Sequence, residues 1–83
     1  MIHHSVDWSS LNGYVVTGGG DNGIALLRVG HDSEGSTLSR EYVRQEAHEG
    51  DVNCVRWNPA ESLGHILVSA GDDCAVKLWK MCL

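Results

Sequence analysis

Apolar and polar residues alternate over short segments of this chain, and turn-forming residues separate the segments. Alternation with a period of two is typical of β-strands. Turn signals stand at Asp21-Asn22-Gly23, Asn58-Pro59 and Gly71-Asp72-Asp73. The pattern predicts strands over residues 5–8, 14–17, 24–29, 38–46, 52–57, 66–69 and 75–80. We therefore expect an all-β fold built from short antiparallel strands.

Helix is the alternative for the segment from Leu38 to His48, because Leu38, Tyr42 and Val43 could share one helical face. No capping residue and no continuation of the helical pattern follow, so strand is favoured. The preceding segment Gly30–Thr37 (GHDSEGST) is rich in glycine, serine and aspartate. This composition predicts a polar loop.

The strand expected over residues 52–57 has apolar residues at both odd and even positions. Simple alternation directs Val55 and Trp57 to one face. The residues directed to the opposite face are Val52, Cys54 and Arg56. Apolar residues on both faces are typical of a sheet that packs between two neighbouring sheets. On this interpretation the thiol of Cys54 is buried.

An internal repeat organises the chain. Ser5–Trp8 (SVDW) aligns with Cys54–Trp57 (CVRW) at an offset of 49 residues, and Val16–Leu27 aligns with Val68–Trp79 at an offset of 52. The offset grows because the second copy holds a three-residue insertion in the segment 58–65, and loops tolerate added length. Self-similarity at such a period is typical of repeat architectures.

Composition narrows the classes of partner and compartment. The formal net charge of −5 argues against nucleic acid or an anionic membrane as a main partner. No apolar run approaches the ~18 residues of a membrane span, and the first residues show no signal-peptide pattern. The cysteines, Cys54, Cys74 and Cys82, lack a C-x-x-C pair, which favours free thiols in a reducing compartment. We therefore expect a cytoplasmic protein, with the nucleus as a further compartment.

Several motifs of the second copy together resemble the WD repeat. They are Ala47-His48, Val52–Pro59 (VNCVRWNP), Leu67–Asp73 (LVSAGDD) and Val76–Lys80 (VKLWK). Ala47-His48 stands at the Gly-His position of the family, and Trp79-Lys80 stands at its Trp-Asp position. The resemblance implies antiparallel four-stranded blades of a β-propeller, here about two blades of an incomplete propeller. Residues 1–46 are expected to form a first, atypical blade with its outer strand, and residues 47–83 a second, well-formed repeat.

The resemblance also implies a structural tetrad of polar residues in a well-formed blade. It carries over onto His48, Ser69, Asp73 and Trp79. A buried indole N–H needs an acceptor, and an imidazole can link a hydroxyl to a carboxylate. A satisfied network of this kind would connect the strands of the second blade to its tight turn.

The first copy keeps only part of this set. Thr17 and Asp21 form a partial tetrad, but Leu27 stands in the place of the tryptophan and Arg28 in the place of the lysine. The first blade is therefore expected to depend on apolar packing.

Three motifs suggest chemistry that the sequence does not favour. Ser69, His48 and Asp73 are the residue types of a hydrolase triad, but Ser69 lies within a strand and outside any G-x-S-x-G turn. Gly18-Gly19-Gly20 lacks the Lys-Ser/Thr of a phosphate-binding loop and is expected to be a turn. His3-His4 could trap a metal ion, although a disordered chain end accounts for them as well. We therefore expect a protein that is not an enzyme and has no cofactor and no metal site.

A finer resemblance concerns one group of WD-repeat proteins. His48–Pro59 (HEGDVNCVRWNP), followed by Leu78-Trp79-Lys80, is similar to the last repeat of the cytosolic iron–sulfur protein assembly WD-repeat family. The resemblance implies an adaptor that binds targeting-complex subunits and client apoproteins rather than the cluster itself. The alternative is another WD-repeat scaffold, in a chromatin, ubiquitin-ligase or trafficking complex.

The expected strands leave both blades open. The second blade ends three residues after Lys80 without an outer strand, and Met1 stands nearly inside the first strand. Repeat folds generally need about three or more units to bury their faces. By itself the chain is therefore expected to be a marginally stable fragment of a propeller with exposed sheet edges.

Overall fold

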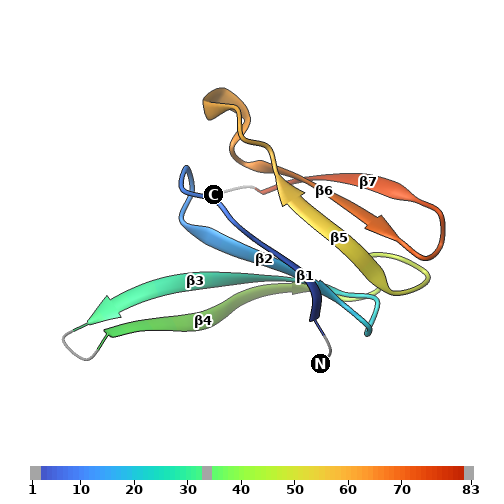
Figure 1. Ribbon diagram of the computed structural model, residues 1–83, viewed down its shortest axis with the longest axis horizontal. Coiled ribbons are helices and arrows are strands. Elements are labelled where there is room, and N and C mark those ends of the chain that lie inside the picture. The colour runs from blue at the N-terminus through green and yellow to red at the C-terminus, as the bar shows by residue number, and fades with distance from the viewer. Residues whose placement is uncertain (1–2, 33–34, 82–83) are drawn as a thin grey trace.

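The computed structural model describes residues 3–32 and 35–81, and within them the chain forms two antiparallel sheets. The first sheet consists of β1 (His3–Trp8), β2 (Tyr14–Gly19), β3 (Ile24–Asp32) and β4 (Gly35–Arg44). The second sheet consists of β5 (Val52–Trp57), β6 (Ile66–Gly71) and β7 (Val76–Lys80). Within each sheet, every strand pairs with its neighbour in sequence (Figure 1). The predicted all-β fold of antiparallel blades is confirmed.

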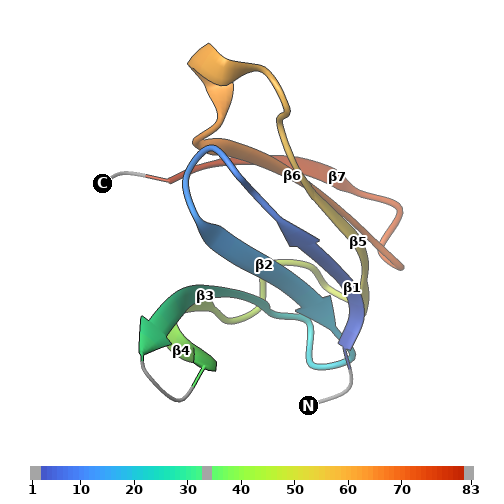
Figure 2. The same ribbon diagram turned by 60° about the vertical axis from the view of Figure 1, so that its left-hand side comes forward.

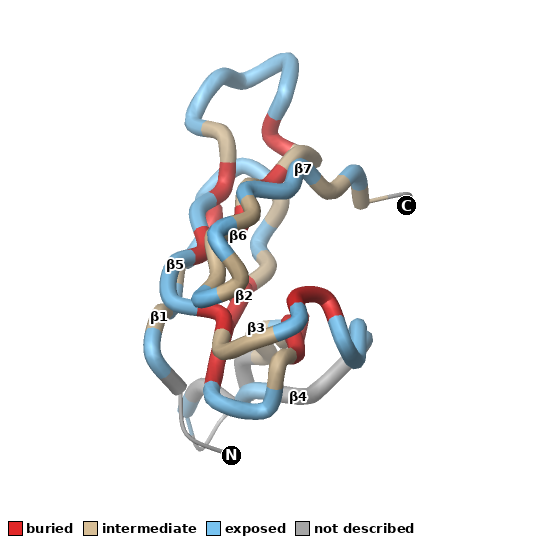
Figure 3. Tube along the Cα trace, turned by 90° about the vertical axis from the view of Figure 1, so that its right-hand side faces the viewer, coloured by how far each residue is buried: buried red, intermediate tan, exposed pale blue. Residues whose placement is uncertain are grey.

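The two sheets pack against each other around a shared core, with β5 lying against β1 and β2 (Figure 1, Figure 2). Buried positions gather along β2, the start of β3 and β5 (Figure 3). The core residues are Val16, Ile24, Leu26, Ala47, Val52, Val55, Trp57 and Leu67. Each sheet contributes one face to this core, so the opposite face of each sheet is not covered by the other.

The predicted faces of β5 are wrong at its first residues. The register of β5 against β6 shifts between Val52 and Cys54. This bulge puts Val52 on the same side as Val55 and Trp57, and all three are buried. Cys54 is exposed rather than buried. A bulge adds one residue to a strand and so inverts the alternation beyond it, which the period of the sequence does not reveal.

The segment predicted as a loop, Gly30–Thr37, is mostly a hairpin. β3 and β4 continue to pair through Gly30↔Thr37, His31↔Ser36 and Asp32↔Gly35, and residues 33–34 lie outside the described part. Hydrogen bonds between antiparallel backbones do not require apolar side chains. Gly35, at φ 127°, adopts a conformation that favours glycine. The end of the hairpin extends away from the second sheet (Figure 1). This end lies outside the shared core, so the segment needs no apolar pattern.

The choice of strand over helix for the segment after Leu38 is confirmed by β4. The strand ends at Arg44 rather than at Glu46. Glu46 has a positive φ of 53°, which an extended strand does not accommodate.

Two glycines expected in a turn lie in a strand instead. Gly18 and Gly19 are the last residues of β2, and the turn begins only at Gly20. The second sheet approaches the first closely at Gly18, because a Cβ built on it would stand 2.6 Å from Cγ1 of Val52. Likewise, β1 begins at His3, so His3 and His4 lie in a strand and not in a disordered chain end.

The segment 58–65, which holds the three-residue insertion, contains a single turn of 3-10 helix, η1 (Glu61–Leu63). The loop that contains it packs on the β1–β2 loop, where Asn12 Nδ2 donates to the Gly64 carbonyl at 2.6 Å. In the part of the chain that the structure describes, no helix is long and apolar enough to cross a membrane.

The two copies of the repeat form the same hairpin turn. Asn22 in the β2–β3 turn and Cys74 in the β6–β7 turn have φ of 66° and 63°. In each turn the aspartate one position earlier accepts a hydrogen bond from the backbone N–H two residues after itself, from Gly23 to Asp21 Oδ1 at 3.3 Å and from Ala75 to Asp73 Oδ1 at 3.1 Å. This Asx geometry is a known preference of aspartate in turns.

Cys74→Asn is expected to stabilise the fold by about 0.5–1 kcal/mol. Asparagine adopts left-handed φ more readily than cysteine, and the first copy already uses asparagine at this position. The midpoint of urea denaturation, measured under reducing conditions, reports the change. Asn22→Cys in the first turn is the reciprocal control and should destabilise by a similar amount. Equal stability of Cys74→Asn and the unchanged chain would show that the turn is not strained.

Candidate functional site

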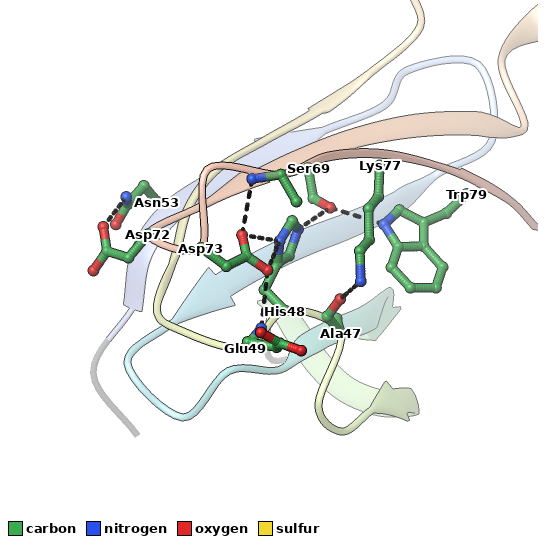
Figure 4. A network of polar contacts seen from close by, with 10 residues as sticks. Ala47, His48, Glu49, Asn53, Ser69, Asp72, Asp73, Lys77 and Trp79 are labelled. Carbon is green, nitrogen blue, oxygen red and sulfur yellow. Dashed lines mark hydrogen bonds and ion pairs between the residues drawn. The ribbon is translucent and has the colours of Figure 1, made fainter.

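A buried polar network lies where the β4–β5 loop meets the second sheet (Figure 4). Ala47 and His48 in this loop are both buried, at 1% exposure each. The backbone N–H of His48 donates to the Asn22 carbonyl at 3.3 Å, which fixes the loop to the β2–β3 turn of the first sheet. The imidazole of His48 is thereby held under β6.

The imidazole connects two strands of the second sheet. His48 Nε2 lies 2.7 Å from Ser69 Oγ on β6, and the same oxygen accepts the indole N–H of Trp79 on β7 at 2.8 Å. Ser69 is fully buried. Antiparallel pairing puts Ser69 and Trp79 on the same face of the sheet, so both side chains can reach one histidine.

The other imidazole nitrogen reaches the β6–β7 turn. His48 Nδ1 lies 2.9 Å and 3.1 Å from the two carboxylate oxygens of Asp73. The carboxylate also accepts backbone N–H groups from Glu49 at 2.9 Å and from Ala75 at 3.1 Å. The structure therefore brings together all four residues that the resemblance assigned to the tetrad.

One arrangement of protons satisfies every member of this chain. The carboxylate of Asp73 can only accept, so His48 Nδ1 carries a proton and donates it. His48 Nε2 then accepts from the Ser69 hydroxyl, which leaves Ser69 Oγ free to accept from Trp79. The direction of each bond follows from its neighbour, and such chains polarise one another cooperatively.

The environment of Asp73 favours its charged form. The Glu49 N–H lowers the pKa of its carboxyl, burial opposes this, and hydrogen bonds from His48 and from the Ala75 N–H lower it further, to about 2 from 3.8. Because the folded pKa lies below the unfolded one, the stability that this group contributes is complete above about pH 3.8 and is lost as the pH falls through about 2.

Asp73→Asn is therefore expected to reduce the loss of folding stability that occurs as the pH falls from about 3.8 to about 2. The amide keeps the size of the side chain but does not titrate. Denaturation midpoints measured across this acidic range report the slope. Asp72→Asn, an exposed neighbour that accepts from Asn53, serves as the matched control and should leave the slope close to that of the unchanged chain. A slope unaffected by Asp73→Asn would contradict this assignment.

Two contacts of the network have no counterpart in the sequence prediction. Lys77 Nζ donates to the Ala47 carbonyl at 2.7 Å, and the guanidinium of Arg44 lies 5.5 Å from the centre of the Trp79 ring, in a cation–π contact. Lys77 pairs directly with Ser69 in the ladder. Its place opposite a tetrad residue is the sequence signal that could have assigned Lys77 to the network. Arg44 comes from β4, so the network also receives a contact from the first sheet.

The corresponding residues of the first sheet form no such network. The buried hydroxyl of Thr17, at the position of Ser69, has no hydrogen-bond partner among the described residues. Asp21, at the position of Asp73, bonds the Gly23 N–H within its own turn. Leu27 is half-buried. The structure thus does not connect Thr17 to Asp21 by a hydrogen bond within the described residues.

The contact between the inner strands is a second feature that sequence reasoning missed. Ser5 Oγ accepts the backbone N–H of Val55 at 3.1 Å, and Asp7 Oδ2 accepts that of Trp57 at 2.7 Å. Side chains of β1 therefore satisfy the free edge of β5, which would otherwise expose unpaired donors. The alternation of Ser5 and Asp7 with Val6 and Trp8 is the pattern that could have revealed this role.

The hydrogen bonds of Ser69, His48 and Asp73 have the connectivity of a hydrolytic triad, but their buried position favours a structural role. Ser69 Oγ is completely buried inside the second sheet and already accepts the Trp79 indole N–H. A nucleophile has to reach a carbonyl carbon and needs oxyanion donors beside it. The arrangement joins strands, and its serine hydroxyl is enclosed by the fold.

The described residues also offer no cluster for a metal ion. Among residues 3–32 and 35–81 there is no group of three or more histidine, cysteine, aspartate or glutamate side chains placed to bind one. Cys54 and Cys74 are exposed free thiols. Cys82 lies outside the described residues.

Known proteins resemble both the repeat and the whole chain. Relatives named probable cytosolic iron–sulfur protein assembly protein CIAO1 homolog are 37% identical in Dictyostelium discoideum and 38% identical in Caenorhabditis elegans, each over 78 residues. A Drosophila mojavensis protein, named probable cytosolic iron–sulfur protein assembly protein Ciao1, is 38% identical over 80 residues. The matches cover 94% of this chain and 23%, 23% and 24% of the relatives, so the chain spans about a quarter of their length.

The family model described as WD domain, G-beta repeat matches residues 39–80. The matched segment begins within β4 and continues through β5, β6 and β7. It includes the loop with His48, and so the whole polar network of the second sheet. With this match over half of its length, the chain belongs to the WD40 repeat family.

Proposed function

We propose that this chain is a non-catalytic protein-interaction scaffold and forms part of a cytosolic adaptor for iron–sulfur protein assembly. The observation that carries the proposal is the similarity at 37–38% identity, over 94% of the chain, to relatives named as probable cytosolic iron–sulfur protein assembly proteins. The cluster is then cargo of the wider machinery. The adaptor binds protein partners, namely targeting subunits and client apoproteins.

The physical character of the chain supports a scaffold. Its one connected set of serine, histidine and aspartate in the described region is buried and holds strands together. Its exposed thiols, Cys54 and Cys74, lie on different strand and turn elements. The uncovered sheet faces and edges are surfaces for other proteins rather than pockets for small substrates.

A chimera tests this role. Residues 1–83 replace the matching segment of the Dictyostelium discoideum relative, and the chimera is expressed in cells depleted of that relative. The readout is radioactive iron incorporated into a cytosolic iron–sulfur apoprotein. If the chain carries the adaptor function of that segment, incorporation should return to most of its normal level.

Two control chimeras make the result specific. One carries the corresponding repeats of a WD40 protein from a chromatin complex, and it should restore nothing. The other carries His48→Ala in the inserted segment and should fail through loss of folded protein. A chimera that accumulates normally but leaves incorporation at the depleted level would refute the adaptor role, and other WD40 functions would then be preferred.

A further inference from the structure

Two asparagines of this chain are directly followed by glycine, in Asn12-Gly13 and Asn22-Gly23. Asparagine is among the thermally labile residues of proteins. In an Asn-Gly sequence the backbone nitrogen of the glycine can attack the side-chain carbon Cγ of the asparagine, because glycine has no Cβ that would shield this nitrogen. Both dipeptides are therefore candidates for spontaneous deamidation, and their surroundings in the fold differ.

The side chain of Asn12 is fixed at both ends of its amide. Its Oδ1 accepts the backbone N–H of Tyr14 at 2.8 Å, and its Nδ2 donates to the Gly64 carbonyl at 2.6 Å. The attacking nitrogen would be that of Gly13, whose N–H donates to the Ser9 carbonyl at 2.9 Å. Cγ of Asn12 can form a bond to this nitrogen only after these three hydrogen bonds break.

The hydrogen bonds around Asn22 are fewer and longer. Its carbonyl accepts the backbone N–H of His48 at 3.3 Å. The attacking nitrogen belongs to Gly23, whose N–H donates to Asp21 Oδ1, also at 3.3 Å. Among the side chains that the structure describes, none forms a hydrogen bond with the Asn22 amide. The amide is therefore not fixed in place as that of Asn12 is.

The backbone of Asn22 already meets one requirement of the reaction. The product of the attack is a succinimide ring, which holds ψ of the asparagine near about −120°, and the first central residue of a type II′ turn combines this ψ with a φ near about +60°. Asn22 has a φ of 66°. A flip of the peptide between Asn22 and Gly23 is then sufficient for ring closure, and glycine tolerates the change in its own φ.

Exposure in the folded chain favours the other site, because Gly13 is exposed and Gly23 is buried. Ring closure, however, takes place in a locally opened chain, where both glycines are accessible. The free energy of opening therefore decides which site reacts. Hydrogen bonds near 2.9 Å are close to ideal, whereas those of 3.3 Å lie beyond the usual range. Opening breaks two long hydrogen bonds at Asn22 and three short ones at Asn12.

We propose that Asn22 is a site of spontaneous deamidation in the folded chain and that the fold protects Asn12. The nitrogen of Gly23 bonds to Cγ of Asn22, and the bond between Cγ and Nδ2 breaks. The side-chain amide leaves as ammonia and takes up the proton that the Gly23 nitrogen loses. Water then opens the ring at either of its carbonyl groups, which gives aspartate or isoaspartate. The inference does not depend on the adaptor role.

The site lies where the first sheet holds the loop of the polar network. The Asn22 carbonyl accepts the N–H of His48, whose imidazole lies under β6. In isoaspartate the main chain runs through Cβ, so the turn becomes longer by a carbon atom and this carbonyl becomes a free carboxylate. The hydrogen bonds from His48 and from Gly23 then no longer fit together as they do in the unmodified turn. Deamidation at Asn22 therefore loosens the loop that carries His48.

Peptide mapping by mass spectrometry, during incubation at mildly alkaline pH, follows both sites in one sample of the purified chain. In the folded chain we expect Asn22 to react at least about tenfold faster than Asn12, since more and shorter hydrogen bonds have to break at Asn12. In concentrated urea the two rates should become similar, because both sites have the same Asn-Gly sequence. Equal rates in the folded chain, or faster loss of Asn12, overturn the proposal.

Gly23→Ala is the matched control for the chemistry. In concentrated urea, where folding has no influence, the new methyl group shields the attacking nitrogen. Loss of Asn22 should slow several-fold, and loss of Asn12 should keep its rate in the same sample. An unchanged rate at Asn22 would mean that the Gly23 nitrogen is not the nucleophile.

The stability of the product tests the link to the polar network. The isoaspartate form is separated by chromatography and compared in urea denaturation with freshly purified Asn22→Asp, which carries the same new charge on an unaltered main chain. The isoaspartate form should unfold at a clearly lower urea concentration than Asn22→Asp. Equal midpoints would show that the altered turn does not loosen the His48 loop, and this part of the inference would then be wrong.

Discussion

His48→Ala is expected to lower the free energy of unfolding by about 3–5 kcal/mol. The substitution removes a fully enclosed ring that fills space between the sheets, and it leaves the buried Ser69 hydroxyl and the Asp73 carboxylate without their histidine partner. Each stranded polar group costs about 1–3 kcal/mol, and the cavity adds to this. Domains have only roughly 5–15 kcal/mol of stability in total, so this loss is a large fraction of it and the midpoint of unfolding should move strongly to lower urea.

The test is urea denaturation of the chain followed by circular dichroism and tryptophan fluorescence. His65→Ala removes a half-buried histidine whose recorded hydrogen bond uses only its backbone carbonyl, and this control should stay within about 0.5 kcal/mol. Ser69→Ala should also destabilise, but the double variant should cost clearly less than the sum of the two, since both changes break the same hydrogen bond. Additive losses would mean that the network does not act as a unit.

The resemblance to the WD repeat allowed this network to be predicted, because each member stands at a fixed place in the motif of that family. His48 precedes a strand, Ser69 lies within one, Asp73 opens a tight turn and Trp79 follows on the next strand. The hairpin ladder fixes these separations, since the register of β6 and β7 follows from the turn between them. The hairpin therefore brings Ser69, Asp73 and Trp79 together by local rules, whereas the placing of His48 also needs the contact of its loop with the Asn22 carbonyl of the first sheet.

What could not be predicted depends on contacts between distant segments. The bulge at the start of β5 and the exposure of Cys54 follow from how β5 fits against the first sheet, and alternation along one strand contains no information about that fit. Ser5 and Asp7 looked like ordinary polar positions of a strand, because the edge they satisfy lies about 50 residues further along the chain. The glycines of β2 looked like a turn for the same reason.

Gly18→Ala is expected to destabilise the chain by about 1–2 kcal/mol, although replacing a strand glycine with alanine normally stabilises a protein. Gly18 does not have a positive φ, so the backbone tolerates alanine, and the entropy of the unfolded chain favours it by about 0.4–1 kcal/mol. The obstacle is space. The new methyl would stand 2.6 Å from Cγ1 of Val52 and 3.1 Å from Cγ1 of Val55, both 0% exposed and β-branched. Overpacking of this kind costs about 1–3 kcal/mol.

The partner residue and the repeat supply the tests of this explanation. Gly18→Ala combined with Val52→Ala should lose less stability than the two single changes added together, by about 1–2 kcal/mol, because the smaller side chain admits the methyl. Ala70→Val enlarges the position of the second sheet that corresponds to Gly18, on the face that the first sheet does not cover. It should change stability by less than about 0.5 kcal/mol. A neutral Gly18→Ala, or a costly Ala70→Val, would mean that the close approach of the two sheets does not set the size of the side chain at this position.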